Sequence, residues 1–147
     1  MIRAGLALTL VSGCAPYQAP PATPPSAAAG PSLYERLGGV DAIRLVVDDF
    51  GARLAADTTI APLFSGVDLD NVKRLLVDQI CQATGGPCVY RGRSMRAAHT
   101  GLGITAAQWD ATIGHLVAAL NRYSVPLREQ RELLGALAGM RGDIVGR

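Results

Sequence analysis

The sequence predicts an all-α fold. After residue 32, apolar residues recur every three or four positions through most of the chain, which is the spacing of one face of an α-helix. No segment alternates apolar and polar residues over five or more positions, as a half-buried β-strand would. Capping residues, glycine and proline stand where such helices would begin and end. We therefore expect six or seven helices and no β-sheet.

The first three helices are marked by their ends and their apolar faces. Ser32 and Glu35 form a capping box, in which a hydroxyl and a carboxylate satisfy free N–H groups at a helix start. A glycine pair ends this short helix, and the spacing of apolar residues then predicts a longer helix from about 41 to 55. After a tight apolar turn, a third helix begins near Asp70. Residues 85–87, Gly-Gly-Pro, end it, because glycine tolerates positive φ and proline cannot continue a helix.

The second half predicts three more helices. Residues 94–99 suit a brief helix, and two glycines then loosen the chain. Thr105 and Gln108 form a second capping box, which opens a long helix. Pro126 suits the first turn of the last helix. The side chains expected to point inward from this last helix are Leu127, Leu134, Leu137 and Met140.

Composition separates a leader from this helical body. The chain has 147 residues, of which 49% are hydrophobic and 18% charged, and six of its nine prolines fall in the first 31 positions. The body, residues 32–147, is long enough to bury one core, which excludes intrinsic disorder, a multidomain enzyme and a disulfide-dense miniprotein. Fourteen basic and twelve acidic side chains nearly balance, and the arginines are scattered along the sequence. We therefore expect no nucleic-acid partner.

The leader has the features of an export segment. Arg3 supplies a positive charge, residues 4–11 form a short apolar run, and Cys14 follows small residues. This run is too short to span a bilayer, which takes about 20 residues. The pattern resembles a bacterial lipoprotein signal, which implies a signal peptide at 1–13, lipid attachment to the membrane through Cys14 and a Pro/Ala-rich tether over 14–31. The body would then sit in the cell envelope, at the outer membrane and facing the periplasm; the alternative is an ordinary cleaved signal.

Residues that could carry chemistry are few. The only histidines are His99 and His115, and no serine–histidine–aspartate set, paired carboxylates, phosphate loop or zinc-type cysteine pairs are evident. His99 ends the brief helix next to apolar residues, and an imidazole that faces an apolar slot is what an axial haem ligand requires. A lone histidine is more often an ordinary core or surface residue, and we interpret His115 as structural.

Six short segments of the body occur in an order that matches a known family. They are residues 32–39 (SLYERLGG), 46–50 (VVDDF), 63–64 (LF), 84–87 (TGGP), 90–95 (YRGRSM) and 99–105 (HTGLGIT). Together they resemble a group I truncated haemoglobin, and the likeness runs through essentially all of 32–147. It implies a two-on-two helical sandwich around non-covalent haem b, with no Cys-x-x-Cys-His attachment motif in the sequence.

The resemblance implies roles for individual residues. His99 takes the position of the proximal histidine that coordinates iron, and Phe64 that of the phenylalanine packed against the haem. Lys73 and Tyr90 are candidates to meet the haem propionates. Gln79 either contacts a bound ligand or lies at the pocket rim. The expected proximal and lower walls are Met95, Leu102, Ile104 and Ile113, and the expected distal face is Val72, Leu75 and Leu76.

Two positions depart from the family pattern. Many members carry a tyrosine and a glutamine that hydrogen-bond to dioxygen, and this sequence has Gly51 and Leu76 there. Loss of such a charge-assisted hydrogen bond costs about 1.5–3 kcal/mol. We therefore expect dioxygen to leave quickly unless Gln79 or a water molecule replaces the missing donor.

Cys81 and Cys88 lie on either side of the Gly-Gly-Pro segment. In an oxidising compartment the two could form a disulfide across this turn. The alternative is a pair of reduced, buried thiols.

The function implied by the resemblance is reversible binding of O₂, NO or CO at a histidine-ligated iron. Oxygen transport or NO scavenging in the cell envelope ranks above committed catalysis. Nitric-oxide dioxygenation or peroxidase-like electron transfer would need an electron donor that the sequence does not identify. The alternative from another class is a haem-free helical lipoprotein that acts as an interaction module.

Overall fold

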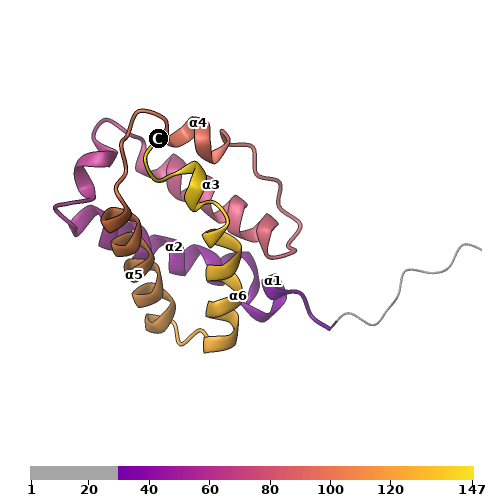
Figure 1. Cartoon of the computed structure of the whole chain (residues 1–147). Helices are drawn as coiled ribbons and strands as arrows, with labels where there is room; N and C mark the ends of the chain where they lie inside the picture. Colours follow the sequence, from indigo (N-terminus) through magenta and orange to yellow (C-terminus); the bar gives the residue numbers. More distant parts are fainter. Residues whose placement is uncertain (1–29) are drawn as a thin grey trace, which may run out of the picture.

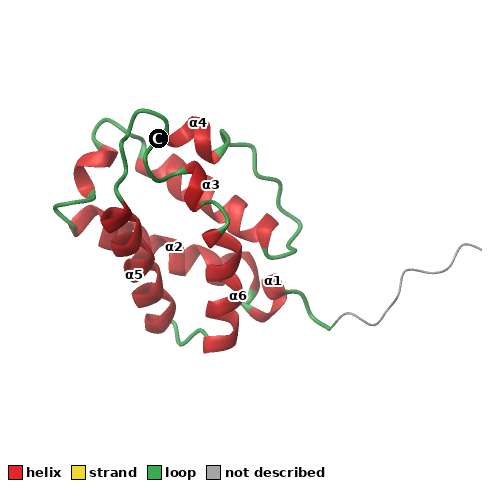
Figure 2. Ribbon diagram, viewed as in Figure 1, coloured by secondary structure: helices red, strands yellow, loops and turns green. Residues whose placement is uncertain are grey.

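A computed structural model describes residues 30–147, and every regular element in this range is helical. In order they are α1 (Leu33–Arg36), α2 (Gly39–Ala56), the 3₁₀ helix η1 (Ala61–Phe64), α3 (Leu69–Ala83), α4 (Met95–His99), α5 (Ala106–Arg122), α6 (Leu127–Ala138) and the 3₁₀ helix η2 (Arg141–Asp143). No strand occurs within residues 30–147 (Figure 2), which confirms the all-α prediction. The expected signal peptide, Cys14 and all but the end of the tether lie outside the described residues.

The long helices form two packed pairs. α2 contacts α3, and α5 contacts α6, while α2 also packs against α5 and so joins the two pairs (Figure 1). The short helix α1 touches both α2 and α6, and α4 lies beside η2 at the opposite end of the molecule. No helix within residues 30–147 is long and apolar enough to cross a bilayer.

Both capping boxes of the sequence are present. The Ser32 side chain accepts a hydrogen bond from the Glu35 N–H at the start of α1, and the Thr105 side chain accepts one from the Gln108 N–H at the start of α5. Each glutamate or glutamine side chain also accepts from the backbone of its capping residue, which satisfies N–H groups that the helix itself leaves unpaired. Pro126 caps α6 from outside and does not stand in its first turn.

The core lies between the helix pairs and draws on all four long helices. Its largest fully buried side chains are Val47, Ile60, Cys81, Leu120 and Leu133. One inward prediction is wrong, because Leu127 is 71% exposed. The buried face of α6 is rotated toward Glu129 and Gln130, two polar residues that a count of apolar positions overlooks.

These two polar side chains are buried because they have partners. The Arg36 Nε donates to Glu129 Oε1 at 3.0 Å. The Gln130 Nε2 donates to Asn121 Oδ1 at 2.9 Å and to the Val125 carbonyl at 2.8 Å. Paired polar groups can be buried without an unsatisfied donor or acceptor, so α6 is held to α1 and to the end of α5 by polar contacts as well as by its leucines.

The turn after α3 needs glycine and is closed by a disulfide. A Cβ added at Gly86 would lie 2.5 Å from Cδ2 of Tyr34 and 2.6 Å from Sγ of Cys81, so no larger residue fits there. The sulfur atoms of Cys81 and Cys88 are bonded at 2.02 Å. The segment from 84 to 94 then leads from the end of α3 to α4.

Candidate functional site

α4 positions His99 and orients its ring. Ser94 caps the helix by accepting a hydrogen bond from the Ala97 N–H at 3.2 Å. The Nδ1 of His99 lies 2.7 Å from the Met95 carbonyl oxygen, and only a protonated nitrogen can donate to that oxygen. The proton therefore sits on Nδ1, and Nε2 keeps its lone pair and makes no hydrogen bond to any residue of 30–147. This is the tautomer in which histidine binds a metal.

His99 stands alone as a metal donor. Among residues 30–147, no three His, Cys, Asp or Glu side chains gather where they could hold a metal ion. One imidazole does not fill the coordination sphere of an ion, and haem brings four further nitrogen donors of its own. The donor set therefore fits haem.

α3 has a second apolar face beside the one that packs in the core. Val77, Ile80 and Cys81 are buried against neighbouring helices. The predicted distal residues Val72, Leu75 and Leu76 are only half-buried. An apolar face that protein side chains leave partly open suits a flat apolar cofactor.

Gln79 connects α3 with the segments that flank it. Its Nε2 lies 3.4 Å from the Met95 sulfur and 3.3 Å from the Met140 sulfur. The structure thus brings together two predicted site residues, Gln79 and Met95. It adds Met140, which the helical pattern predicts only as an inward side chain of the last helix.

The other predicted wall residues are spread around these helices. Phe64 ends η1 and is half-buried, as are Ile104, just before α5, and Ile113 within it. Leu102 is 41% exposed in the loop after α4. Leu102 is therefore more exposed to solvent than the other three.

The two propionate candidates have protein partners. The Lys73 Nζ lies 3.1 Å from Asp48 Oδ1 and 3.1 Å from Asp70 Oδ1, and the hydrogen bond to Asp48 is the main cause of the raised pKa of Lys73. The Tyr90 hydroxyl donates to the Arg93 carbonyl at 2.7 Å, and burial raises the pKa of Tyr90. The structure does not bring Lys73 and Tyr90 together. Lys73 lies on α3 and is paired with carboxylates of α2 and α3, whereas Tyr90 lies in the loop between α3 and α4.

A cavity of about 620 Å³ lies between α2, η1 and α3. Phe64, Val72 and Leu76 line it, so it adjoins the predicted distal face. Gly51 lines it from α2, and a Cβ at this position would lie 3.2 Å from Cδ of Lys73. The aliphatic part of Lys73 therefore lies over Gly51, and a side chain at this position would need Lys73 to shift by a few tenths of an ångström.

His115 belongs to the framework of the fold. Its Nε2 lies 2.8 Å from Oδ2 of Asp57, the residue that follows α2. The hydrogen bond to His115 and those from Thr59 lower the pKa of Asp57 to about 2. This contact ties α5 to the end of α2, in agreement with the structural role expected for His115.

Comparison with known proteins also identifies residues 32–145 as a globin. A family model described as bacterial-like globin matches residues 32–145. A group 1 truncated hemoglobin, GlbN, of Mycolicibacterium paratuberculosis is 36% identical over 113 residues, which cover 77% of this chain and 83% of the relative. GlbN of a Nostoc species is 34% identical over 116 residues, which cover 79% of this chain and 98% of the relative.

Solved structures agree at the level of the fold. The truncated hemoglobin of Tetrahymena pyriformis in its Fe(III) form superposes with a TM-score of 0.76 at 29% identity, covering 80% of this chain and 100% of that one. The 2/2 hemoglobin of a Synechococcus species, in the cyanomet state and with covalently attached heme, superposes with a TM-score of 0.74 at 32% identity, again covering 80% and 100%. The two helix pairs are therefore the two-on-two truncated globin fold, and with residues 32–145 matched by the family model, the chain belongs to the bacterial-like globin family and its cofactor is haem b.

Proposed function

We propose that this globin reversibly binds the diatomic gases O₂, NO and CO at a haem iron held by His99. The observation that carries the proposal is the hydrogen bond of 2.7 Å between Nδ1 of His99 and the Met95 carbonyl. It fixes the ring and leaves the Nε2 lone pair for iron. Haem-based gas binding is the function of the family, and the assignment to His99 and to these three gases is the part proposed for this chain.

Several side chains would hold the cofactor and keep water away from it. Haem, when bound, supplies an iron with one coordination position free for a gas. Val72, Leu75 and Leu76 would cover one side with apolar atoms, and Phe64 would pack at the edge where η1 meets the cavity. Apolar walls of this kind exclude water, which otherwise competes for the free position.

The cavity next to these walls offers few hydrogen-bond donors. Among its lining side chains, only Ser65 and Lys73 carry a donor group, and the Nζ of Lys73 is already held by Asp48 and Asp70. Binding of O₂ would gain from a hydrogen-bond donor in this cavity, whereas binding of CO would depend on such a donor much less. We therefore infer that the site retains CO and NO better than O₂, which favours NO scavenging or transient oxygen binding over committed catalysis.

We further propose that the domain is exported and lipid-anchored. The support is the leader alone, with its short apolar run, small residues and Cys14, followed by the Pro/Ala-rich tether to residue 31. Expression with a labelled fatty acid tests this. The wild-type chain should carry the label, and Cys14→Ser should not. Label on both, or on neither, would contradict the anchor, and fractionation would show whether the labelled protein reaches the outer membrane.

The role of His99 is tested by titrating the purified chain with haemin. We expect wild-type protein to give a Soret band with one equivalent of haem, and His99→Ala to lose histidine coordination. His115→Ala is the matched control, because it removes the other histidine and should leave the haem spectrum unchanged. Unaltered coordination in His99→Ala would overturn the assignment.

A further inference from the structure

The end of the molecule that carries α4 gathers arginines that are far apart in the sequence. Residues 89–104 contain Arg91, Arg93 and Arg96, and residues 139–147 contain Arg141 and Arg147. The two segments lie side by side, since the Gly103 N–H donates to the Arg147 carbonyl and the Gly146 N–H donates to the Ile104 carbonyl, each at 2.8 Å. We call these two segments together the α4 face.

The charge on the α4 face is one-sided. It holds five arginines and a single carboxylate side chain, that of Asp143. This carboxylate already forms an ion pair with Arg96, whose Nη2 lies 2.7 Å from Asp143 Oδ1. The sequence has no aspartate or glutamate from residue 79 to residue 109. The rest of the described chain has eight basic and eleven acidic side chains. The numbers of basic and acidic side chains nearly balance over the whole chain, but the α4 face is positively charged and the rest of the described chain is slightly negative.

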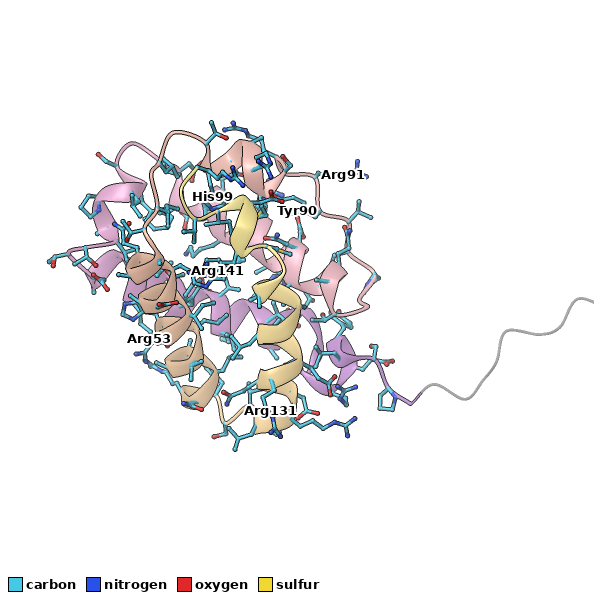
Figure 3. All side chains as sticks on the ribbon, viewed as in Figure 1. Arg53, Tyr90, Arg91, His99, Arg131 and Arg141 are labelled. Atoms are coloured by element: carbon cyan, nitrogen blue, oxygen red, sulfur yellow. A yellow bond between two sulfur atoms is a disulfide. The ribbon has the colours of Figure 1, made fainter. Side chains whose placement is uncertain are left out.

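Four of these arginines are available to a partner. The side chains of Arg91 and Arg141 are exposed and have no hydrogen-bond or ion-pair partner within residues 30–147. Arg93 and Arg147 donate only to backbone carbonyls, those of Ala97 and Gly142. Figure 3 shows Arg91 toward the end of the molecule where His99 lies, Arg141 between His99 and the middle of the molecule, and Arg131 at the opposite end.

The same face exposes apolar side chains. Val89 is 59% exposed and Leu102 is 41% exposed. Arginines interspersed with exposed apolar residues are typical of a protein–protein interface, where arginine is enriched and apolar contacts form the centre.

We propose that the α4 face docks a small acidic electron-carrier protein. This inference rests on the proposed function, because α4 ends in His99, the predicted iron ligand. A carrier bound there would lie against the helix that holds the iron. In the step it supports, the reduced carrier loses one electron and ferric iron gains it, with no bond made or broken. Complementary charge would mainly raise the rate of encounter.

The arrangement favours a protein partner over a membrane surface. The described chain begins beside α1, at the end of the molecule away from α4 (Figure 1). An N-terminal anchor would therefore attach to the domain away from the α4 face and would not itself hold that face against the membrane, which leaves it open to soluble partners.

The test uses the haem-loaded protein and a defined probe, a reduced plant-type [2Fe–2S] ferredoxin, which is acidic and strongly reducing. Stopped-flow absorption measures the second-order rate of reduction of the ferric protein at low and high ionic strength. We expect the wild-type rate to fall as salt is added. We expect Arg91→Glu combined with Arg141→Glu to lower the rate about tenfold at low salt.

Arg131→Glu is the matched control, since Arg131 is exposed on α6 at the opposite end and its reversal changes net charge by the same amount as one test substitution. It should leave the rate nearly unchanged, and Arg91→Glu alone should lower it. Equal rates in all variants, or a wild-type rate independent of salt, would overturn the proposal. Binding of the domain to vesicles containing phosphatidylglycerol, lost in the Arg91 and Arg141 variants, would assign the face to a membrane and also overturn it.

The Soret band of each variant separates this proposal from the one on which it rests. A normal band with unaffected rates refutes the docking face and leaves the haem assignment intact. A band that is absent, or unchanged by His99→Ala, refutes the proposed function itself.

Discussion

Gly51 is the residue at which a missing side chain changes the site most. It faces a cavity of about 620 Å³ that adjoins Phe64 and Leu76, and the nearest atom to an added Cβ is in the flexible chain of Lys73, at 3.2 Å. A Cβ at this position therefore fits if the flexible side chain of Lys73 moves by a few tenths of an ångström, and a larger side chain would extend from there toward the cavity. The position combines room for a side chain with a shortage of hydrogen-bond donors.

Gly51→Tyr should slow the release of dioxygen. A phenol hydroxyl in the cavity would supply a hydrogen bond worth about 1.5–3 kcal/mol, which corresponds to roughly 10- to 150-fold in the dissociation rate constant. Flash photolysis or stopped-flow mixing measures that constant. Gly51→Phe is the control, because it fills the same space without a hydroxyl. Equal slowing by both substitutions would show that filled volume, and not hydrogen bonding, controls release.

The pair formed by His115 and Asp57 makes stability depend on pH. The pKa of Asp57 is lowered to about 2 by His115 and Thr59, so the folded state favours the carboxylate. A lowered carboxyl pKa contributes stability above the unfolded pKa of about 4, and this contribution is lost as pH falls from about 4 to 2. Asp57→Asn should therefore lower the Tm at neutral pH and flatten its fall between those values.

Asp41→Asn serves as the comparison in thermal denaturation across this pH range. Asp41 lies on the exposed side of α2 and pairs only with the exposed Arg44, and such pairs contribute little. A fall in Tm as large for Asp41→Asn as for Asp57→Asn would contradict the importance of the contact between α5 and the end of α2.

At the scale of elements, the disulfide ties the end of α3 to the segment that leads to α4. Cys81 and Cys88 are seven positions apart, and closing so short a loop stabilises the fold by about 2.5 kcal/mol on the chain-entropy estimate. The double substitution Cys81→Ala with Cys88→Ala should lower the free energy of unfolding by about that amount. Denaturant titration with and without a reductant checks it: the reductant should destabilise the wild-type chain and leave the variant unchanged. Two free thiols in the unreduced protein would contradict the bond.

α6 provides a test of how its buried face is oriented. Leu133 is 2% exposed and Leu127 is 71% exposed. Leu133→Ala should cost about 2–5 kcal/mol of unfolding free energy, whereas Leu127→Ala should change it by less than about 0.5 kcal/mol. Chemical denaturation measures both. Similar losses for the two substitutions would mean that α6 packs in a different rotation.

The helix ends were predictable from sequence, but the rotation of α6 was not. Ser32 and Thr105 act through hydrogen bonds to residues three positions away, so a short stretch of sequence contains the whole interaction. The burial of Glu129 depends on Arg36, which is 93 positions away in the chain. A pattern of apolar residues within one helix contains no information about a partner as distant in sequence as Arg36. The pattern therefore predicted Leu127, and not Glu129, on the buried face of α6.

The candidate site divides in the same way. His99 at the end of a brief helix could be predicted because the helix, its cap and the neighbouring glycines are local features. The contact of Gln79 with Met95 and Met140 joins three separate segments, and only the fold brings them together. The sequence shows that Lys73 is basic, but it does not show that the Lys73 side chain is paired with two carboxylates. Those carboxylates belong to Asp48 of α2 and to Asp70 in the first turn of α3.

At the scale of the whole molecule, charge is where sequence and structure differ most. The arginines appear scattered along the chain, yet the pairing of residues 103–104 with 146–147 collects five of them at one end. Net charge is a property of composition, whereas a charged face is a property of the fold. The absence of a carboxylate between residues 79 and 109 was the one feature of the sequence that could have indicated it.

If His99 holds a haem iron that binds gases, the absorption spectrum of the haem-loaded ferrous protein must change when CO is added. We expect a five-coordinate ferrous spectrum in the wild-type protein that changes to a CO-bound form. In His99→Ala the histidine-ligated ferrous spectrum should be lost. A ferrous spectrum that does not respond to CO, or one that is the same in wild type and His99→Ala, would contradict the account.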